Sequence, residues 1–220
     1  PARLLPARPR ASPPPRQPTP PKRGHHTAGY LDQEQCIVVR SSLSGQTPDH
    51  YVSLSGGHVS PYTNWATAAT NIQAAVDVAF AGDTVWVSNG VYNTGGSATP
   101  GYSLTSRVVI ATAVSVKSVN GSSAATIEGA SDGGTNGPAA VRCVYLAGGA
   151  VLEGFTLTNG FSGNGGSWAD QSGAGVFIVS NGVVSKCVIR DCRAVQYGGG
   201  AELLEGGRLV NCLLTGNEAQ

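Results

Sequence analysis

Three segments in the second half of the chain share one pattern of apolar and polar positions. Residues 144–160, 176–192 and 201–217 align without gaps, at spacings of 32 and 25 residues. Their apolar residues fall in four columns: Leu146, Ile178 and Leu203; Leu152, Val184 and Leu209; Phe155, Cys187 and Cys212; and Leu157, Ile189 and Leu214. The last two columns are two residues apart, so their side chains share one face of a β-strand.

A repeat of this kind is typical of a solenoid. A unit of about 25 residues with two or three short strands cannot bury its apolar face alone. Coils stacked about 4.8 Å apart pair their backbones and bury the columns as ladders. Small turn residues between the strands, such as Gly148-Gly149 and Asn181-Gly182, let the chain change direction. The sequence therefore predicts an all-β parallel β-helix of roughly four or five coils, which we expect to be truncated at Gln220.

Shorter strand-like segments extend this pattern toward the N-terminus. Residues 107–121 and 125–127 are predicted as an earlier coil, and residues 51–54 and 84–88 as short strands. The 32-residue spacing exceeds the 25-residue one by seven residues. The excess lies in the Gly/Ser-rich stretch 161–172, which predicts a protruding loop.

One segment has helical periodicity, and we expect a helix over residues 70–81. Its apolar residues recur at i, i+3, i+4 and i+7: Ile72, Ala75, Val76 and Ala79. Thr70 and Gln73 fit a capping box, and Gly82 is placed to end the helix in a left-handed conformation. An uncovered first coil would expose apolar ladder and an unpaired strand edge, so this helix is predicted to cap the N-terminal end of the stack.

The first part of the chain has a different composition. Residues 1–23 hold nine of the thirteen prolines, which remove backbone donors and prevent helix or sheet. We therefore expect a disordered Pro/Arg-rich segment over residues 1–48, followed by the β-helix over residues 49–220. Such a basic segment is either a tail that binds an anionic partner or a linker outside the domain.

Charge and cysteine content exclude several classes of protein. Residues 1–50 hold seven Lys/Arg against three Asp/Glu, and residues 51–220 hold seven against ten, giving the net charge of +1. A weakly acidic folded part predicts no nucleic-acid partner. The five cysteines lack the paired spacing of a zinc site, so no metal and no cofactor are expected. Cys187 and Cys212 share an inward column, which fits buried thiols or, in an exported protein, a disulfide between coils.

Targeting signals are not visible in this sequence. No run of about 18 apolar residues predicts a membrane span, and the first residues lack the apolar core of a signal peptide. The chain contains no Met, even at position 1, so we expect a fragment or a processed piece of a longer protein.

Several motifs resemble a known family. Residues 51–65, 68–76, 82–87 and 89–92, then 142–146, 152–160, 198–201 and 211–217, resemble bacterial right-handed parallel β-helix repeat proteins of the pectin-lyase-like superfamily. The chain looks closest to secreted or surface-anchored members, and Gly198-Gly199-Gly200-Ala201 and Thr215-Gly216-Asn217 are also similar to polymorphic outer-membrane autotransporter passengers. The resemblance implies a right-handed coil and a location outside the cell or at its surface.

The acidic residues do not form the clusters that catalysis in this superfamily needs. Pectate lyases hold calcium with several carboxylates on one sheet, and glycoside hydrolases need two carboxylates facing one sugar. In the alignment Glu153 lies over Ser185 and Val210, and Asp191 over Asn159 and Gly216, so no carboxylate column forms. Glu202 and Glu205 are close in sequence, but nothing places them across a cleft. We therefore predict no catalytic residue in this segment.

The candidate binding residues are Trp168, Asp170 and Asp191. Trp168 lies in the Gly/Ser-rich loop, where an exposed indole can stack on a sugar ring, whereas Trp65 and Trp86 are expected to pack at the cap. We expect an exported structural or binding protein that serves in cell-surface adhesion or in contact with a polysaccharide or cell-surface glycan. The alternative is a polysaccharide lyase or glycoside hydrolase whose active site lies on coils beyond this fragment.

Overall fold

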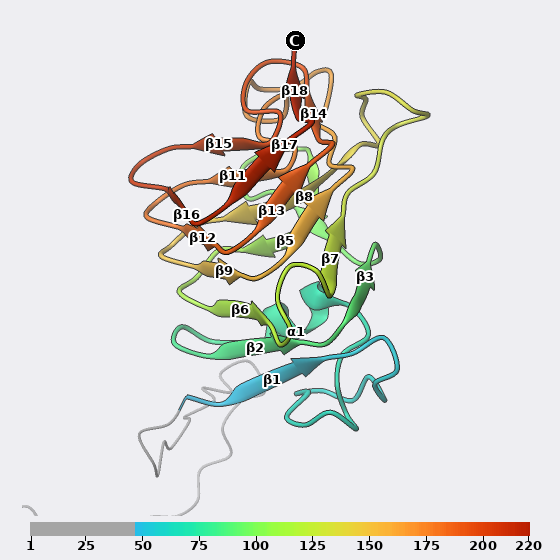
Figure 1. Ribbon diagram of the computed structural model, residues 1–220, viewed down its shortest axis with the longest axis vertical. Helices are drawn as coiled ribbons and strands as arrows, with labels where there is room; N and C mark the ends of the chain where they lie inside the picture. Colours follow the sequence, from blue (N-terminus) through green and yellow to red (C-terminus); the bar gives the residue numbers. More distant parts are fainter. Residues whose placement is uncertain (1–46) are drawn as a thin grey trace, which may run out of the picture. The chain divides into compact units, whose positions relative to one another are not determined.

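The computed structural model describes residues 47–220, which form a parallel β-solenoid of about four turns (Figure 1). Its strands stack into three sheets, here called A, B and C. This confirms the predicted all-β parallel β-helix. The predicted Pro/Arg-rich segment falls almost wholly outside the described residues.

From β6 onward, successive coils add one strand to each sheet, whereas the first described strand, β1, adds to sheet A alone. Sheet A has the order β1 (Asp49–Val52), β2 (Thr84–Val87), β6 (Ser115–Ser118), β9 (Val151–Glu153), β12 (Val183–Ser185) and β16 (Arg208–Val210). Sheet B contains β3 (Gly90–Tyr92), β7 (Ala125–Glu128), β10 (Thr156–Thr158), β13 (Val188–Arg190) and β17 (Leu213–Thr215). Sheet C contains β4 (Ser97–Ala98), β5 (Thr105–Ile110), β8 (Val141–Leu146), β11 (Val176–Ile178) and β15 (Ala201–Leu203). A short pair of β14 (Arg193–Ala194) and β18 (Glu218–Ala219) completes the strands of the described chain.

The predicted apolar columns are ladders between neighbouring strands. Ile178 pairs with Leu146 and Leu203, Val184 with Leu152 and Leu209, and Ile189 with Leu157 and Leu214. The ladders continue into the earlier coil through Ile110, Val116 and Ile127. Phe155 and Cys187 are buried in the same core, where the Phe155 backbone N–H donates to Cys187 Sγ at 3.3 Å. The gapless alignment therefore predicted the strand register correctly.

The corners between the sheets have a repeated left-handed backbone. Residues with positive φ recur at each corner in the last three coils: Gly148-Gly149, Ser180-Asn181 and Glu205-Gly206; Gly154, Lys186 and Asn211; and Asn159, Asp191 and Gly216. A left-handed residue turns the chain sharply between two strands but costs an L-residue other than glycine roughly 1–2 kcal/mol. Backbone hydrogen bonds between successive coils connect these corners, as from the Lys186 N–H to the Val210 carbonyl and from the Asn181 N–H to the Glu205 carbonyl, each at 3.0 Å.

The helix α1 (Ile72–Val78) is shorter than the predicted span and begins at a different residue. Asn71 is the N-cap and accepts a hydrogen bond from the Ala74 N–H at 2.9 Å, while the hydroxyl of Thr70 hydrogen-bonds His58 Nδ1. The predicted capping box is therefore wrong. The helix ends before Gly82, which has a φ of +95° in the turn that follows.

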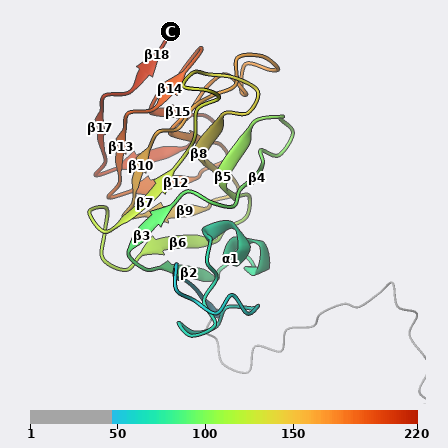
Figure 2. The same ribbon diagram turned by 90° about the vertical axis from the view of Figure 1, so that its right-hand side faces the viewer.

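Helix α1 lies beside β1, β2 and β5 (Figures 1 and 2). Its Gln73 side chain is buried against β5, where Oε1 accepts from the Val109 N–H at 2.7 Å and Nε2 donates to the Val109 carbonyl at 3.3 Å. An unpaired strand edge buried away from water is costly. The side-chain amide takes the place of a neighbouring strand at this point.

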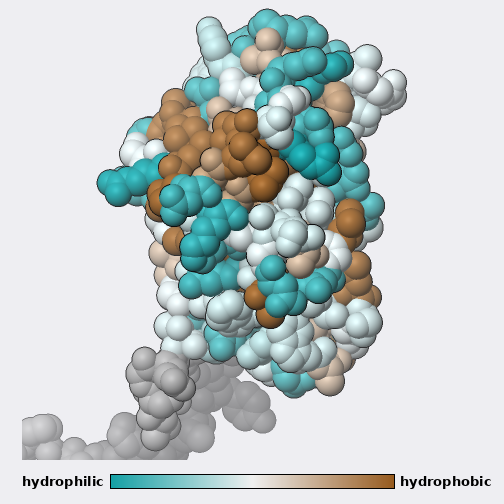
Figure 3. All heavy atoms as spheres, viewed as in Figure 1, coloured by the Kyte–Doolittle hydropathy of each residue, from teal (hydrophilic) through white to brown (hydrophobic). Residues whose placement is uncertain are grey.

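The last described coil has a different surface from the earlier ones. Its inward positions on β15 and β17 are partly open, with Leu203 38% and Leu214 45% exposed, whereas Leu146 and Leu157 in earlier coils are fully buried. Together with Val210 and Leu213 they contribute to an apolar area over β15–β17 (Figure 3).

Candidate functional site

The predicted loop, residues 161–172, folds over the outer face of sheet C. Strand alternation points Tyr145 and Phe177 outward on neighbouring strands, and their rings stack with centroids 6.1 Å apart. Tyr102 packs on Phe177 from one side at 6.3 Å, and Trp168 packs on it from the loop at 5.8 Å. We call Tyr102, Tyr145, Trp168 and Phe177 the sheet C aromatic cluster.

Trp168 is the exposed member of this cluster. Phe177 and Tyr145 are buried, but 44% of Trp168 remains accessible to solvent. Its contact with Phe177 holds one part of the indole, so the rest is presented to solvent in a fixed orientation.

Arg142 of β8 anchors the loop to sheet C. Its side chain is buried, and its guanidinium donates to the carbonyls of Ala169 (2.6 Å), Ser172 (2.8 Å) and Gly173 (2.9 Å) and to Thr99 Oγ1 (3.1 Å). The guanidinium carbon also lies 4.8 Å from the Phe177 ring centroid. Burial lowers the pKa of Arg142 to about 10, so the group stays charged at neutral pH. One buried cation therefore organises both the loop backbone and the aromatic cluster.

Asp170 fixes the loop to the neighbouring segment. Its Oδ1 accepts from the backbone N–H groups of Ser103 (2.9 Å) and Leu104 (2.7 Å), and its Oδ2 accepts from the Ser167 N–H and hydroxyl, each at 3.0 Å. Burial by itself would raise the pKa of Asp170, but the hydrogen bonds from Leu104, Ser167 and Ser103 outweigh it and lower the pKa below its ordinary value. Both carboxylate oxygens thus have internal partners, and Asp170 shapes the loop that carries Trp168.

A hollow of about 260 Å³ opens between this loop and the two segments beside it. It is lined by Ser103, Leu104, Gly137, Pro138, Gly163, Asn164, Gly165, Gly166 and Asp170. The Ser103 hydroxyl and the Asn164 amide are its polar side-chain groups beside the Asp170 carboxylate. Four glycines leave the backbone of the hollow accessible to a ligand.

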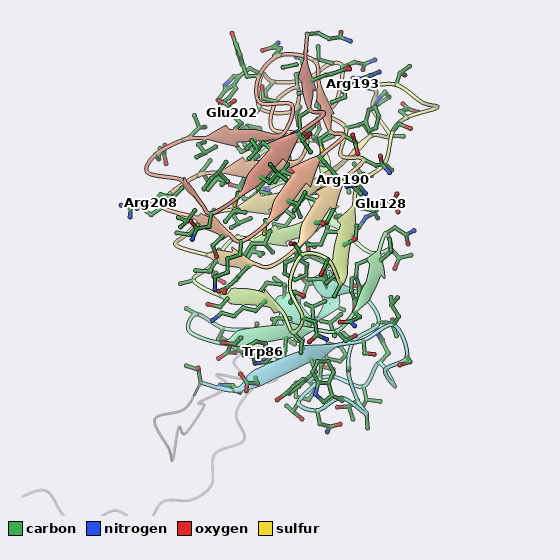
Figure 4. The ribbon with its side chains drawn as sticks, in the orientation of Figure 1. Trp86, Glu128, Arg190, Arg193, Glu202 and Arg208 are labelled. Carbon is green, nitrogen blue, oxygen red and sulfur yellow. The ribbon has the colours of Figure 1, made fainter. Side chains whose placement is uncertain are left out.

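Asp191 lines a different hollow, at the corner after β13. This hollow, of about 390 Å³, is bordered by Gly134, Phe161, Asp191, Cys192, Arg193, Gly216 and Glu218. The Asp191 carboxylate pairs with Arg190, and Arg193 pairs with Glu218 at 2.8 Å. Figure 4 labels Arg190 and Arg193, which contribute the two cations of this corner. The structure therefore brings Trp168 and Asp170 together on one loop and leaves Asp191 in a separate charged hollow.

The outer face of sheet A carries aromatic residues that the sequence reasoning assigned to the cap. Trp86 points outward on β2, between the inward Val85 and Val87, and Trp65 is 44% exposed. Trp65 packs edge to face on Tyr51 of β1, with ring centroids 4.7 Å apart. The alternation of Val85, Trp86 and Val87 predicts the outward position of Trp86, because the two valines define the inward side of this strand.

Within residues 47–220, no group of three or more His, Cys, Asp or Glu side chains is arranged to hold a metal ion. The same part of the chain contains a buried pair, in which His50 Nε2 lies 3.1 Å from Asp83 Oδ2 and His50 Nδ1 lies 2.8 Å from the Pro61 carbonyl. His50 occupies the first rung of a core ladder, as the register partner of Val85. The helix of the described chain is too short to cross a bilayer.

The fold defines the class of this protein as the parallel β-solenoids. Comparisons of the chain with protein-family models, with curated proteins and with solved structures found no match. The resemblance to the pectin-lyase-like superfamily therefore stays a prediction.

Proposed function

We propose that this protein is an exported β-helix of the pectin-lyase-like, surface-anchored type that contacts glycans at a cell surface. The observation that carries the proposal is Trp168, an indole that is partly exposed and held in place on an ordered loop. An aromatic face stacks on the C–H face of a sugar ring, and the stacking is stronger when the ring is already ordered before binding.

The surroundings of Trp168 suit such a ligand. Arg142 donates three hydrogen bonds to backbone carbonyls of residues 169–173, and the Asp170 carboxylate accepts four more from Ser103, Leu104 and Ser167. The adjacent hollow offers a hydroxyl and an amide, which hydrogen-bond sugar hydroxyls. In the second hollow, Asp191 and Arg193 provide charged groups for a further contact with the same polymer.

The test is binding of the full chain to a panel of immobilised polysaccharides, measured by surface plasmon resonance. We expect Trp168→Ala to weaken binding by roughly tenfold, which corresponds to about 1.4 kcal/mol. Trp168→Phe keeps an aromatic ring and is expected to retain most of the affinity. Tyr197→Ala removes another exposed aromatic residue, 60% accessible, and serves as the matched control. Equal binding by wild type and Trp168→Ala to every glycan would contradict the proposal.

Two further experiments test the location and the absence of catalysis. An antibody raised against the solenoid is expected to label intact source cells before permeabilisation, and labelling only after permeabilisation would refute export. Incubation with pectin and other acidic glycans in calcium is expected to yield no rise in the ultraviolet absorbance of unsaturated products. Sustained turnover would favour a lyase instead.

A further inference from the structure

The outer face of sheet A presents a second surface with the chemistry of a sugar site. Tyr51 of β1, Trp86 of β2 and Lys117 of β6 are register partners, so their side chains form one outward column. Ser53, Ser88 and Val119 follow two residues further along and continue the same outward side. The backbone pairing extends to this point, because the Ser88 N–H donates to the Val52 carbonyl and the Val119 N–H donates to the Val87 carbonyl. In Figure 4, Trp86 lies by β1 and β2, well away from Arg193.

The third aromatic ring comes from an ordered loop. Trp65 stands at the end of a segment whose backbone is hydrogen-bonded back to residues 57–59, including Gly57 N–H to the Ala66 carbonyl at 2.9 Å. The Asn64 side chain accepts from the Thr67 N–H at 3.0 Å and closes the turn around Trp65. Because Trp65 also packs against Tyr51, its exposed indole is fixed before any ligand arrives. We call Tyr51, Trp65 and Trp86 the aromatic strip.

A polar hollow lies next to the aromatic strip. It encloses about 400 Å³ and is lined by Ser53, Ser55, Trp65, Ser88, Asn89, Val119 and Asn120. Its volume is within the range of about 300–1,000 Å³ that is usual for small-ligand sites. Asn120 Nδ2 donates to Asn89 Oδ1 at 2.8 Å, which fixes both amides at the edge of the hollow. Three serine hydroxyls and two amides beside an indole are groups that hydrogen-bond a polyhydroxylated ring.

Lys117 contributes a cation beside Trp86. Its ammonium lies 5.8 Å from the Trp86 ring centroid. Glu153, its register partner on β9, forms its ion pair with Lys186 at 2.6 Å instead. Lys117 therefore places a cation with N–H donors beside the indole of Trp86.

We infer that the hollow beside the aromatic strip binds a pyranose ring of a neutral glycan, stacked on Trp65 and hydrogen-bonded by Ser53, Ser88 and Asn120. This site lies on sheet A and does not use Trp168, so it extends the proposed glycan contact to a second, independent surface.

Tryptophan fluorescence separates the two surfaces, because the chain has three tryptophans and one of them is Trp168. In full-length Trp168→Ala protein the remaining signal comes from Trp65 and Trp86. We expect saturable quenching or a blue shift of this signal with at least one of cellohexaose, xylohexaose, mannohexaose and maltohexaose. Adding Trp65→Ala to this background is expected to raise Kd by roughly tenfold.

A second variant keeps the test independent of any folding defect in Trp65→Ala. Asn89→Ala removes one exposed amide from the hollow and leaves all three aromatic rings in place, and we expect it to weaken binding severalfold with an unchanged circular dichroism spectrum. If Trp168→Ala protein folds but none of the four hexasaccharides changes its fluorescence, the inference is overturned. If a hexasaccharide changes the fluorescence of wild type but not that of the Trp168→Ala protein, this inference is overturned and the proposed role of Trp168 is left intact.

Discussion

The side chain of Gln73 forms both hydrogen bonds of a missing strand partner with the backbone of Val109, at 2.7 Å and 3.3 Å. Val109 pairs with Tyr145 of β8 on one edge of β5, and β4 pairs the other edge only at Thr105 and Ser106. Helix α1 thereby closes the edge opposite β8 at Val109. A side-chain amide has the same donor and acceptor as a peptide group, so one glutamine is enough to satisfy one residue of a strand.

Replacing Gln73 with leucine is expected to destabilise the solenoid by about 1–3 kcal/mol, because the Val109 N–H and carbonyl would be buried without partners. Urea unfolding followed by circular dichroism measures the difference. Gln171→Leu is the matched control, since the Gln171 amide makes a single long contact of 3.5 Å, to the Ser167 carbonyl. A loss as small as that of the control would show that Gln73 does not close the strand edge.

Acid is expected to release the loop that carries Trp168. The pKa of Asp170 is lowered in the folded protein, so its contribution to stability is present above its ordinary value of 3.8 and is lost as the pH falls through the lower folded value. Asp170→Asn removes this titration. The difference in unfolding free energy between wild type and Asp170→Asn should therefore shrink as the pH is lowered from 5 toward 2. A constant difference over that range would contradict the assignment.

The position of a residue along a ladder is expected to set the cost of truncating it. Leu152 and Leu209 belong to the same ladder. Leu152 is fully buried, whereas Leu209, in the last described coil, is only partly buried. We expect Leu152→Ala to cost about 2–5 kcal/mol and Leu209→Ala clearly less, because the second change leaves a smaller enclosed cavity. Equal losses in urea unfolding would mean that the last coil is covered in solution.

Buried thiols in the core are expected to resist alkylation. Burial raises the pKa of Cys187 to about 12, so at pH 8 the thiol is almost entirely protonated and is a poor nucleophile. Iodoacetamide followed by mass spectrometry should label Cys187 only after denaturation, and should label the partly exposed Cys212 sooner. Rapid labelling of Cys187 in folded protein would refute its burial.

The strand register could be predicted from the sequence because the same columns recur three times, and a slip of one residue would turn every apolar side chain outward. The helix start could not, since Thr70 and Asn71 are both good N-caps and the choice depends on His58, twelve residues away from Thr70. The loop depends on contacts over still longer separations. The hydrogen bonds that join Arg142 to residues 169–173 and Asp170 to residues 103–104 leave no local pattern in the sequence. The Gly/Ser-rich stretch therefore indicated Trp168 as a candidate, but no pattern indicated the residues that support it.

Trp86 shows the opposite case. The valines on either side of it defined the inward face of β2, and strict alternation would have placed the indole outside. The prediction that Trp86 packs at the cap makes no use of this alternation.

Affinity electrophoresis tests most directly whether the solenoid contacts glycans through its exposed indoles. The full-length protein runs through native gels that contain each polysaccharide of the panel, beside the Trp65→Ala/Trp168→Ala double variant and the Tyr197→Ala control. We expect at least one polysaccharide to retard wild type and Tyr197→Ala but not the double variant. Equal retardation of the folded double variant, or no retardation of wild type in any gel, would contradict the proposed glycan contact.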